Sequence, residues 1–345
     1  MREKYQRDSR FEFLRILGMI MIVLSHFSIY GNWDTSNISA IGTVRLLAFD
    51  GFGPIGAMIF FIISGYFYNK KDINTRANKS RKKAILTWMK TFFYSVIMFL
   101  LCLAMHIPIG LKEKIITLFP FSFNEYWFIT CYLIITVFSP YIDEVIDQIT
   151  EARFFKLLLF MFLLMFLELL NNEITNKLLV AFFGYLIGAY LQINRDTIVS
   201  KIKDGQLLLV IILGYALDLV SIYICKKVGV SFSKSAHFTQ YVLSTIMAVS
   251  IFIIVIKRKS FVNIFVNTIA LGAFAVYLIT EQVSFRHVLW SKILNVGQYQ
   301  NSHYLYLIGL GLSMLIYFVC ASFDIIIGYL FNMFKKWFVN CVKGN

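Results

Sequence analysis

The sequence FEFLRILGMIMIVLSHF occupies residues 11–27 and begins the first long apolar run of the chain. It carries two ionisable residues, Arg15 and His26, eleven positions apart. A charged side chain at the centre of a membrane helix costs roughly 2.5–3.5 kcal/mol on insertion scales, so such residues usually face protein or water. Eleven steps of about 100° make about three full turns, so Arg15 and His26 share one helix face, roughly 16 Å apart along the axis. This geometry allows a site divided between the two sides of a membrane.

The composition of the whole chain is that of a membrane protein. Of its 345 residues, 59% are hydrophobic and only 15% are charged, and the mean hydropathy is +0.71. Soluble domains average about 45–50% apolar and about 25% charged residues. We therefore predict an all-α fold, a polytopic membrane helical bundle, as one integral-membrane domain over residues 1–345.

The apolar runs predict about ten transmembrane helices, because each is near the ~20 residues that a bilayer requires. These runs cover residues 12–31, 51–68, 84–106, 126–142, 154–170, 178–193, 206–224, 239–256, 262–282 and 304–330. Asp218 and Asp324 fall inside two of them, where an unpaired charge is costly, so each is either a site residue or the partner of an arginine.

The basic residues predict how the chain is oriented. With the N-terminus inside, 21 of the 33 lysines and arginines fall in inner segments and nine in outer segments. This asymmetry favours both termini in the cytoplasm. The net charge of +14 also raises the question of nucleic acid. Because the basic residues lie in short loops between apolar runs, we expect a lipid bilayer and no nucleic acid as partner.

The cysteines and histidines give no metal-binding pattern. The five cysteines form no CxxC pair, and the histidines other than His26 fall near outer loops without ligand spacing. We therefore predict no metal site. The basic start and apolar run of the N-terminus could be a signal peptide, but Arg15 interrupts the run and no small-residue cleavage site follows. We expect an uncleaved first helix.

Four segments, taken in order, resemble the motifs of the membrane acyltransferase-3 family. The first is Arg15 and His26 with ten residues between them, which is similar to the Arg-x10-His motif of that family. The second is GPIGAMIFFIISGY at residues 53–66, which is similar to the FFxxSGY segment of the family. The third is the stretch at residues 126–140, from Tyr126-Trp127 to Ser139-Pro140. The fourth is AFAVYLITE at residues 273–281, which is similar to the family's VYLIH segment.

The resemblance implies an activity and a location. Members of this family acylate cell-surface and secreted glycans, so we expect an O-acyltransferase. We expect it to take an acyl group from cytoplasmic acyl-CoA, with acetyl as the expected acyl group and acetyl-CoA as the expected donor. The acceptor is expected to be a hydroxyl of an extracytoplasmic glycan, and the location a bacterial cell membrane. The alternative is a glycan exporter of the same membrane family, for which ten spans and buried charges are also suitable. Binding of CoA would separate the two.

Three residues are candidates for the chemistry. His26 is predicted to be the general base, or a transient acyl carrier, because the reference pKa of histidine, about 6.5, suits proton transfer near neutral pH. Arg15 could hold a phosphate or an acyl carbonyl; alternatively it snorkels at the inner edge and pairs with Glu12. Glu281 could orient His26, or it could be a solvated residue at a helix end.

The remaining candidates concern the two substrates. The family often carries RxxR after its second span, where this chain has Arg81-Lys82-Lys83. Lysines can still attract phosphate as point charges, so we predict that this basic loop contacts acyl-CoA, with topology signalling and lipid contact as the alternative. Tyr126 and Trp127 are placed like interfacial aromatics, and they could also stack on an acceptor sugar. The family histidine after Tyr-Leu-Ile is replaced by Thr280, so its role is not carried over.

Overall fold

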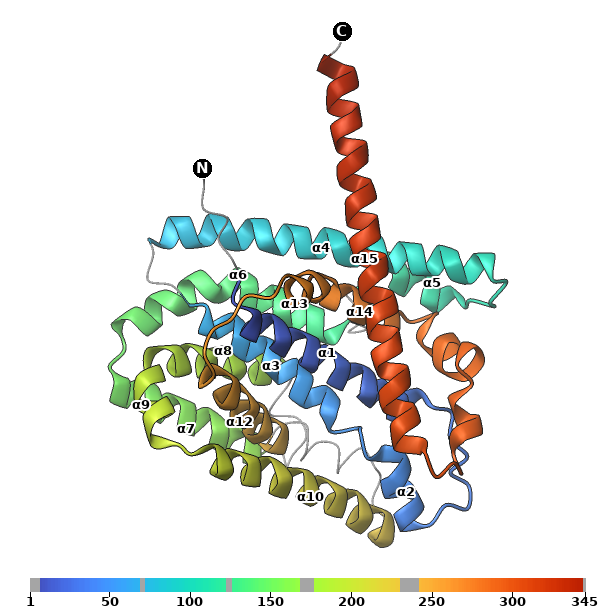
Figure 1. Ribbon diagram of the computed structural model, residues 1–345, viewed down its shortest axis with the longest axis horizontal. Helices are drawn as coiled ribbons and strands as arrows, with labels where there is room; N and C mark the ends of the chain where they lie inside the picture. Colours follow the sequence, from blue (N-terminus) through green and yellow to red (C-terminus); the bar gives the residue numbers. More distant parts are fainter. Residues whose placement is uncertain (1–6, 69–71, 122–125, 168–176, 230–241, 344–345) are drawn as a thin grey trace.

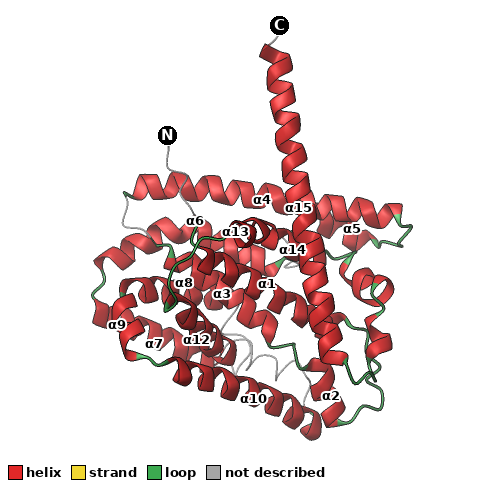
Figure 2. Cartoon of the chain, viewed as in Figure 1, coloured by secondary structure: helices red, strands yellow, loops and turns green. Residues whose placement is uncertain are grey.

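The computed structural model describes residues 7–68, 72–121, 126–167, 177–229 and 242–343, with side chains up to Tyr329. The described residues form helices, turns and loops and contain no strand (Figure 2). The prediction of an all-α fold is confirmed.

Three helices form the centre of the bundle: α1 (Ser9–Tyr30), α3 (Phe52–Tyr66) and α8 (Lys177–Ile193) (Figure 1). Glycines let their backbones approach closely. A methyl group on Gly56 would collide with the Gly18 carbonyl oxygen, and one on Gly65 would collide with the Tyr185 carbonyl oxygen. Small residues permit this kind of packing within membranes, where lipid is as apolar as leucine and close contact drives helix association.

The outer helices present apolar side chains to the surroundings. These are α4 (Ile73–Ala104), α6 (Trp127–Gln148), α10 (Asp204–Val228) and α15 (Leu305–Lys343). The apolar stretches of α4, α10 and α15 are 22–28% buried, against 61% for α1. Exposed leucines, isoleucines and phenylalanines cover much of the described surface, which fits contact with lipid tails rather than water. The C-terminal part of α15 extends beyond the other helices (Figure 1).

Shorter helices complete the chain. They are α2 (Ala40–Leu47), α5 (Leu111–Leu118), α7 (Glu151–Leu167), α9 (Arg195–Lys201), α12 (Ser244–Ile256), α13 (Ile264–Ile269) and α14 (Ala273–Thr280), with irregular helical turns at Ala270–Gly272, Val288–Ile293 and Val296–Tyr299.

The structure supports a membrane bundle, but it does not confirm ten spans. Where it is described, each of the ten predicted runs coincides with a helix or a pair of short helices; residues 168–170 and 239–241 of these runs lie outside the described residues. Among the described residues, six helices are long and apolar enough to cross a membrane, and a seventh span is possible where α8 continues into α9 through an 83° bend. The helices at Ser244–Ile256 and Ile264–Thr280 are shorter than a full crossing.

The basic segment before the third span was predicted to be a loop, but in the structure it is part of helix α4. Helix α4 begins at Ile73, eleven residues before the predicted start, and Asp72 caps it by accepting a hydrogen bond from the Thr75 amide at 3.1 Å. An N-cap aspartate satisfies an otherwise unpaired amide, and the lysines and arginines that follow are good helix formers. Arg81, Lys82 and Lys83 therefore point in fixed directions from a helix.

The charge expected to be costly in the last span has a partner. Asp324 of α15 accepts hydrogen bonds from Lys90 and Tyr94 of α4, both at 2.7 Å. The partner is a lysine and not the expected arginine, since either cation can neutralise a buried carboxylate.

Candidate active site

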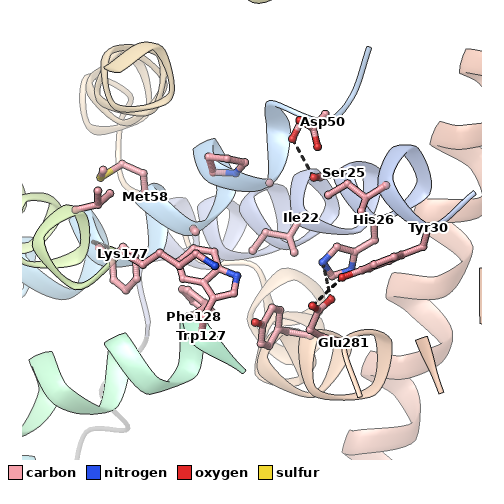
Figure 3. A pocket seen from close by; sticks show the side chains of 17 residues that line it. Ile22, Ser25, His26, Tyr30, Asp50, Met58, Trp127, Phe128, Lys177 and Glu281 are labelled. Carbon is pink, nitrogen blue, oxygen red and sulfur yellow. Dashed lines mark hydrogen bonds and ion pairs between the residues drawn. The ribbon is translucent and has the colours of Figure 1, made fainter. Parts of the chain in front are cut away.

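His26 and Glu281 meet in the interior, although they lie on opposite ends of the chain. His26 Nε2 is 3.0 Å from Glu281 Oε2, and the two residues are only 7% and 6% exposed (Figure 3). Helix α14 ends at Thr280, and the chain turns there, so the next side chain is directed against α1. At this distance the two groups form an ion pair when the imidazole is protonated. The structure brings together two of the three predicted catalytic residues.

Two further residues hold the Glu281 carboxylate. Its Oε1 accepts hydrogen bonds from the Tyr30 hydroxyl at 2.9 Å and from Arg286 at 3.3 Å. The Arg286 guanidinium also lies 5.5 Å from the centre of the Tyr30 ring. A buried carboxylate needs such partners, and together they fix its position beside His26. Sequence reasoning missed both residues, although Tyr30 is one turn beyond His26, at the i+4 position that shares its face.

The second ring nitrogen of His26 is free for chemistry. His26 Nδ1 is buried and has no hydrogen-bond partner among the residues that the structure describes. A carboxylate at Nε2 favours the tautomer with the proton on that nitrogen. The lone pair then resides on Nδ1, which is the form that a general base requires.

A cavity of about 130 Å³ opens beside His26. On α1 it is lined by Ile22, Ser25, His26, Ile29 and Tyr30, which recur at helical spacing on one face. Its other polar or charged side chains are those of Asp50, Lys177, Tyr277 and Glu281. Since liquid water takes up about 30 Å³ per molecule, the cavity has room for a small group such as acetyl or part of one sugar. We call it the His26 cavity.

The two aromatic residues predicted for the acceptor have different surroundings. Trp127 lines the His26 cavity, and the Lys177 ammonium lies 4.8 Å from the centre of one of its rings. Tyr126 is 2% exposed, does not line this cavity, and donates a hydrogen bond to the Leu278 carbonyl oxygen at 3.1 Å. Trp127 can therefore contact a bound sugar, whereas Tyr126 ties α6 to α14.

Arg15 is paired locally. Its guanidinium lies 2.6 Å from Glu12 Oε1, three residues earlier, so the predicted alternative of a pairing with Glu12 is present. Arg15 does not line the His26 cavity. Its charge acts on Tyr132 of α6, which also interacts with Lys83. Arg15 thus belongs to the surroundings of a second, basic cavity.

That second cavity, of about 580 Å³, lies along α4. From α4 it is lined by Lys79, Lys82, Lys83, Leu86, Thr87 and Lys90, with Arg7 from the N-terminal segment. The α4 residues recur at three- and four-residue steps and so occupy one helix face. Arg81 is not in the lining, because two steps of about 100° each place it about 200° around the helix from Lys79. Five cations beside apolar walls suit an anionic ligand with an apolar portion. We call it the basic cavity.

A layer of aromatic rings lies between the two cavities. Phe128 and Tyr277 line the His26 cavity, and Tyr132 and Phe274 line the basic cavity. The ring centres of Phe128 and Tyr277 are 5.3 Å apart, those of Tyr132 and Phe274 are 4.8 Å apart, and Phe128 is 6.0 Å from Phe274. These four residues, from α6 and α14, form what we call the aromatic partition.

The comparison with protein families agrees with the motifs. A family sequence model described as an acyltransferase domain matches residues 8–322, which is most of the chain. No curated protein and no solved structure gives a significant match. The match includes the aromatic partition and the linings of both cavities except Arg7, and it confirms the resemblance drawn from the four motifs. The chain belongs to the membrane acyltransferase-3 family.

Proposed function

We propose that this acyltransferase is an integral-membrane O-acyltransferase that moves an acetyl group from acetyl-CoA to a hydroxyl of a cell-surface or secreted polysaccharide. The observation that carries the proposal is the contact of His26 with Glu281 at a small cavity, separated by one aromatic layer from a cavity lined by five cations. In this proposal the His26 cavity carries out the acyl transfer, and the adjacent basic cavity binds the anionic donor.

The basic cavity is the proposed donor site. Acyl-CoA carries several phosphate charges on its nucleotide, and charge-assisted hydrogen bonds to them are roughly twice as strong as neutral ones. Lys79, Lys82 and Lys83 supply such charges, and Leu86 and Phe274 offer apolar contact to the rest of the molecule. The thioester end would then pass between the rings of the aromatic partition into the His26 cavity, while the nucleotide stays among the lysines.

The His26 cavity is the proposed reaction site. As the acceptor oxygen attacks the thioester carbonyl carbon, its proton passes to His26 Nδ1. The carbon–sulfur bond then breaks, and the imidazolium returns the proton to the CoA thiolate, so an ester and free CoA thiol result. Glu281 stabilises the imidazolium that forms between these steps. Alternatively, His26 carries the acetyl group itself before the acceptor takes it.

Incubation of the purified protein with acetyl-CoA tests this function through the release of free thiol. We expect steady release only when a glycan acceptor is added. One equivalent released per protein without acceptor would assign the carrier role to His26. No release with any glycan, together with no binding of CoA, would contradict the proposal and favour glycan export.

The proposed orientation places both termini and the basic cavity in the cytoplasm of a bacterial cell. In a variant without its native cysteines, single cysteines at Lys79 and at Lys226 should label differently with an impermeant thiol reagent. Lys226 lies in the last turn of α10, just beyond the predicted span 206–224, and the proposed orientation puts that end of the span outside. Only the cysteine at Lys226 should react in intact cells; reaction at Lys79 alone would reverse the orientation.

A further inference from the structure

Asp50 is a buried acid that the proposed reaction does not use. It lies in the turn between α2 and α3 and is 7% exposed. It lines the His26 cavity, and it lies beside Ser25 in Figure 3, away from the Glu281 carboxylate. The cavity is thus lined by two acids, from elements that are far apart in the sequence.

The backbone of Asp50 is fixed, but its carboxylate is not engaged. The Asp50 carbonyl oxygen accepts a hydrogen bond from Ser25 Oγ at 2.9 Å, and the Asp50 amide donates to the Leu47 carbonyl oxygen at 3.0 Å. Within the described residues the carboxylate oxygens have neither a hydrogen-bond donor nor an ion-pair partner. Glu281 differs, because Tyr30 and Arg286 both donate to it.

A buried carboxylate without donors is costly, and a ligand that supplies donors removes that cost. A sugar offers several hydroxyl groups at once, one to react and its neighbours to donate. An anionic group at the same place would be repelled by Asp50, since like charges in a desolvated cavity disfavour each other. Trp127 lines the same cavity beside Lys177 and gives a sugar an aromatic contact there.

We propose that Asp50 positions the acceptor: its carboxylate accepts a hydrogen bond from the hydroxyl next to the reacting one, which selects an acceptor with adjacent hydroxyls and no negative charge there. The inference rests on the proposed function and names the substrate class of that site. Asp50 is a positioning and specificity residue, while His26 remains the base.

Binding of simple probes tests the inference without any turnover. The probes are cis-1,2-cyclohexanediol, with adjacent hydroxyls, and cyclohexanol, with one; methyl glucoside and methyl glucuronoside add a comparison of charge. We expect calorimetry to show that the protein prefers the diol over the alcohol and the glucoside over the glucuronoside. Asp50→Asn should reduce both preferences by about 10- to 100-fold, the range for one hydrogen bond to a charged group.

The matched control is Asp196→Asn, since the Asp196 side chain is 99% exposed on α9. It should bind all four probes as the parent does. Equal preferences in Asp50→Asn and the parent would overturn the inference, as would a parent that does not distinguish the diol from the alcohol. A lower melting temperature of Asp50→Asn with unchanged preferences would assign Asp50 to the fold, as an acid before the N-terminus of α3.

Kinetics separate the inference from the proposed function. With acetyl-CoA present, Asp50→Asn should raise the KM for the diol, whereas kcat and CoA affinity change by less than about threefold. A parent that releases no thiol from acetyl-CoA refutes the proposed function, yet the probe preferences still decide the inference. Loss of CoA binding in Asp50→Asn would contradict a role on the acceptor side.

Discussion

The His26 cavity and the basic cavity share a wall but differ in size and charge. The first is about 130 Å³ and contains a histidine, two acids and one lysine; the second is about 580 Å³ and is lined by five cations. A small cavity with a paired histidine favours proton transfer, because both partners are held in place. A wide basic cavity favours attraction of an anion, which tolerates looser geometry. Under the proposed function, the His26 cavity sets the rate of acyl transfer and the basic cavity sets the affinity for the donor.

The largest expected effect is on turnover, and it is expected for a change at His26. His26→Gln should lower turnover by about 100- to 10,000-fold, the usual contribution of a general base, because glutamine keeps hydrogen bonding but cannot take up a proton. CoA affinity should stay as in the parent. Thiol release and calorimetry on the same preparation measure the two quantities. Near-normal turnover would reduce His26 to a packing residue and remove the contrast between the cavities.

A smaller loss is expected for the residue that holds His26. Glu281→Gln removes the charge that stabilises the imidazolium, so kcat should fall by about 10- to 100-fold while CoA affinity is unchanged. Glu144→Gln, a change at an exposed position of α6, serves as control. A kcat within about twofold of the parent would show that the 3.0 Å contact has no catalytic consequence.

Changes in the lysines of α4 test the proposed affinity of the basic cavity for CoA. Lys82→Gln together with Lys83→Gln should weaken CoA binding by about tenfold or more, because two charges near the phosphates are lost. Arg81→Gln is the matched control, since Arg81 lies outside the lining, and it should change the affinity little. The loss should shrink at high salt, as screening predicts. Equal effects at all three positions would indicate a general surface attraction instead of a formed site.

The smallest effect is expected at Arg15. Its charge is already paired with Glu12 and lies outside the lining of either cavity. Arg15→Gln should therefore weaken CoA binding by only about two- to fivefold, through the loss of charge near Tyr132, as measured by calorimetry. A loss larger than that of the double lysine variant would place the donor phosphates at Arg15 and move the donor site along α1.

These expectations show which features the sequence could predict. The shared face of Arg15 and His26 follows from helix periodicity alone. Glu281 was a candidate because a motif ended there, yet its contact with His26 joins residues about 250 positions apart, and Asp50 and Arg286 gave no local signal at all. The basic segment was assigned to a loop because it is polar, although Asp72 is a recognisable N-cap. Once α4 begins at Ile73, its helical phase decides which lysines line the cavity.

The aromatic partition has a consequence for the cell that makes this protein. Energised membranes store work as ion gradients, and any continuous water path through a protein would dissipate them. Phe128, Tyr132, Phe274 and Tyr277 fill the space between the two cavities with rings whose centres are 4.8–6.3 Å apart. Such a layer gives no hydration to a proton or a sodium ion. Under the proposed function, these rings would close around the thioester as it passes, so that acyl transfer would not open a continuous water path for ions.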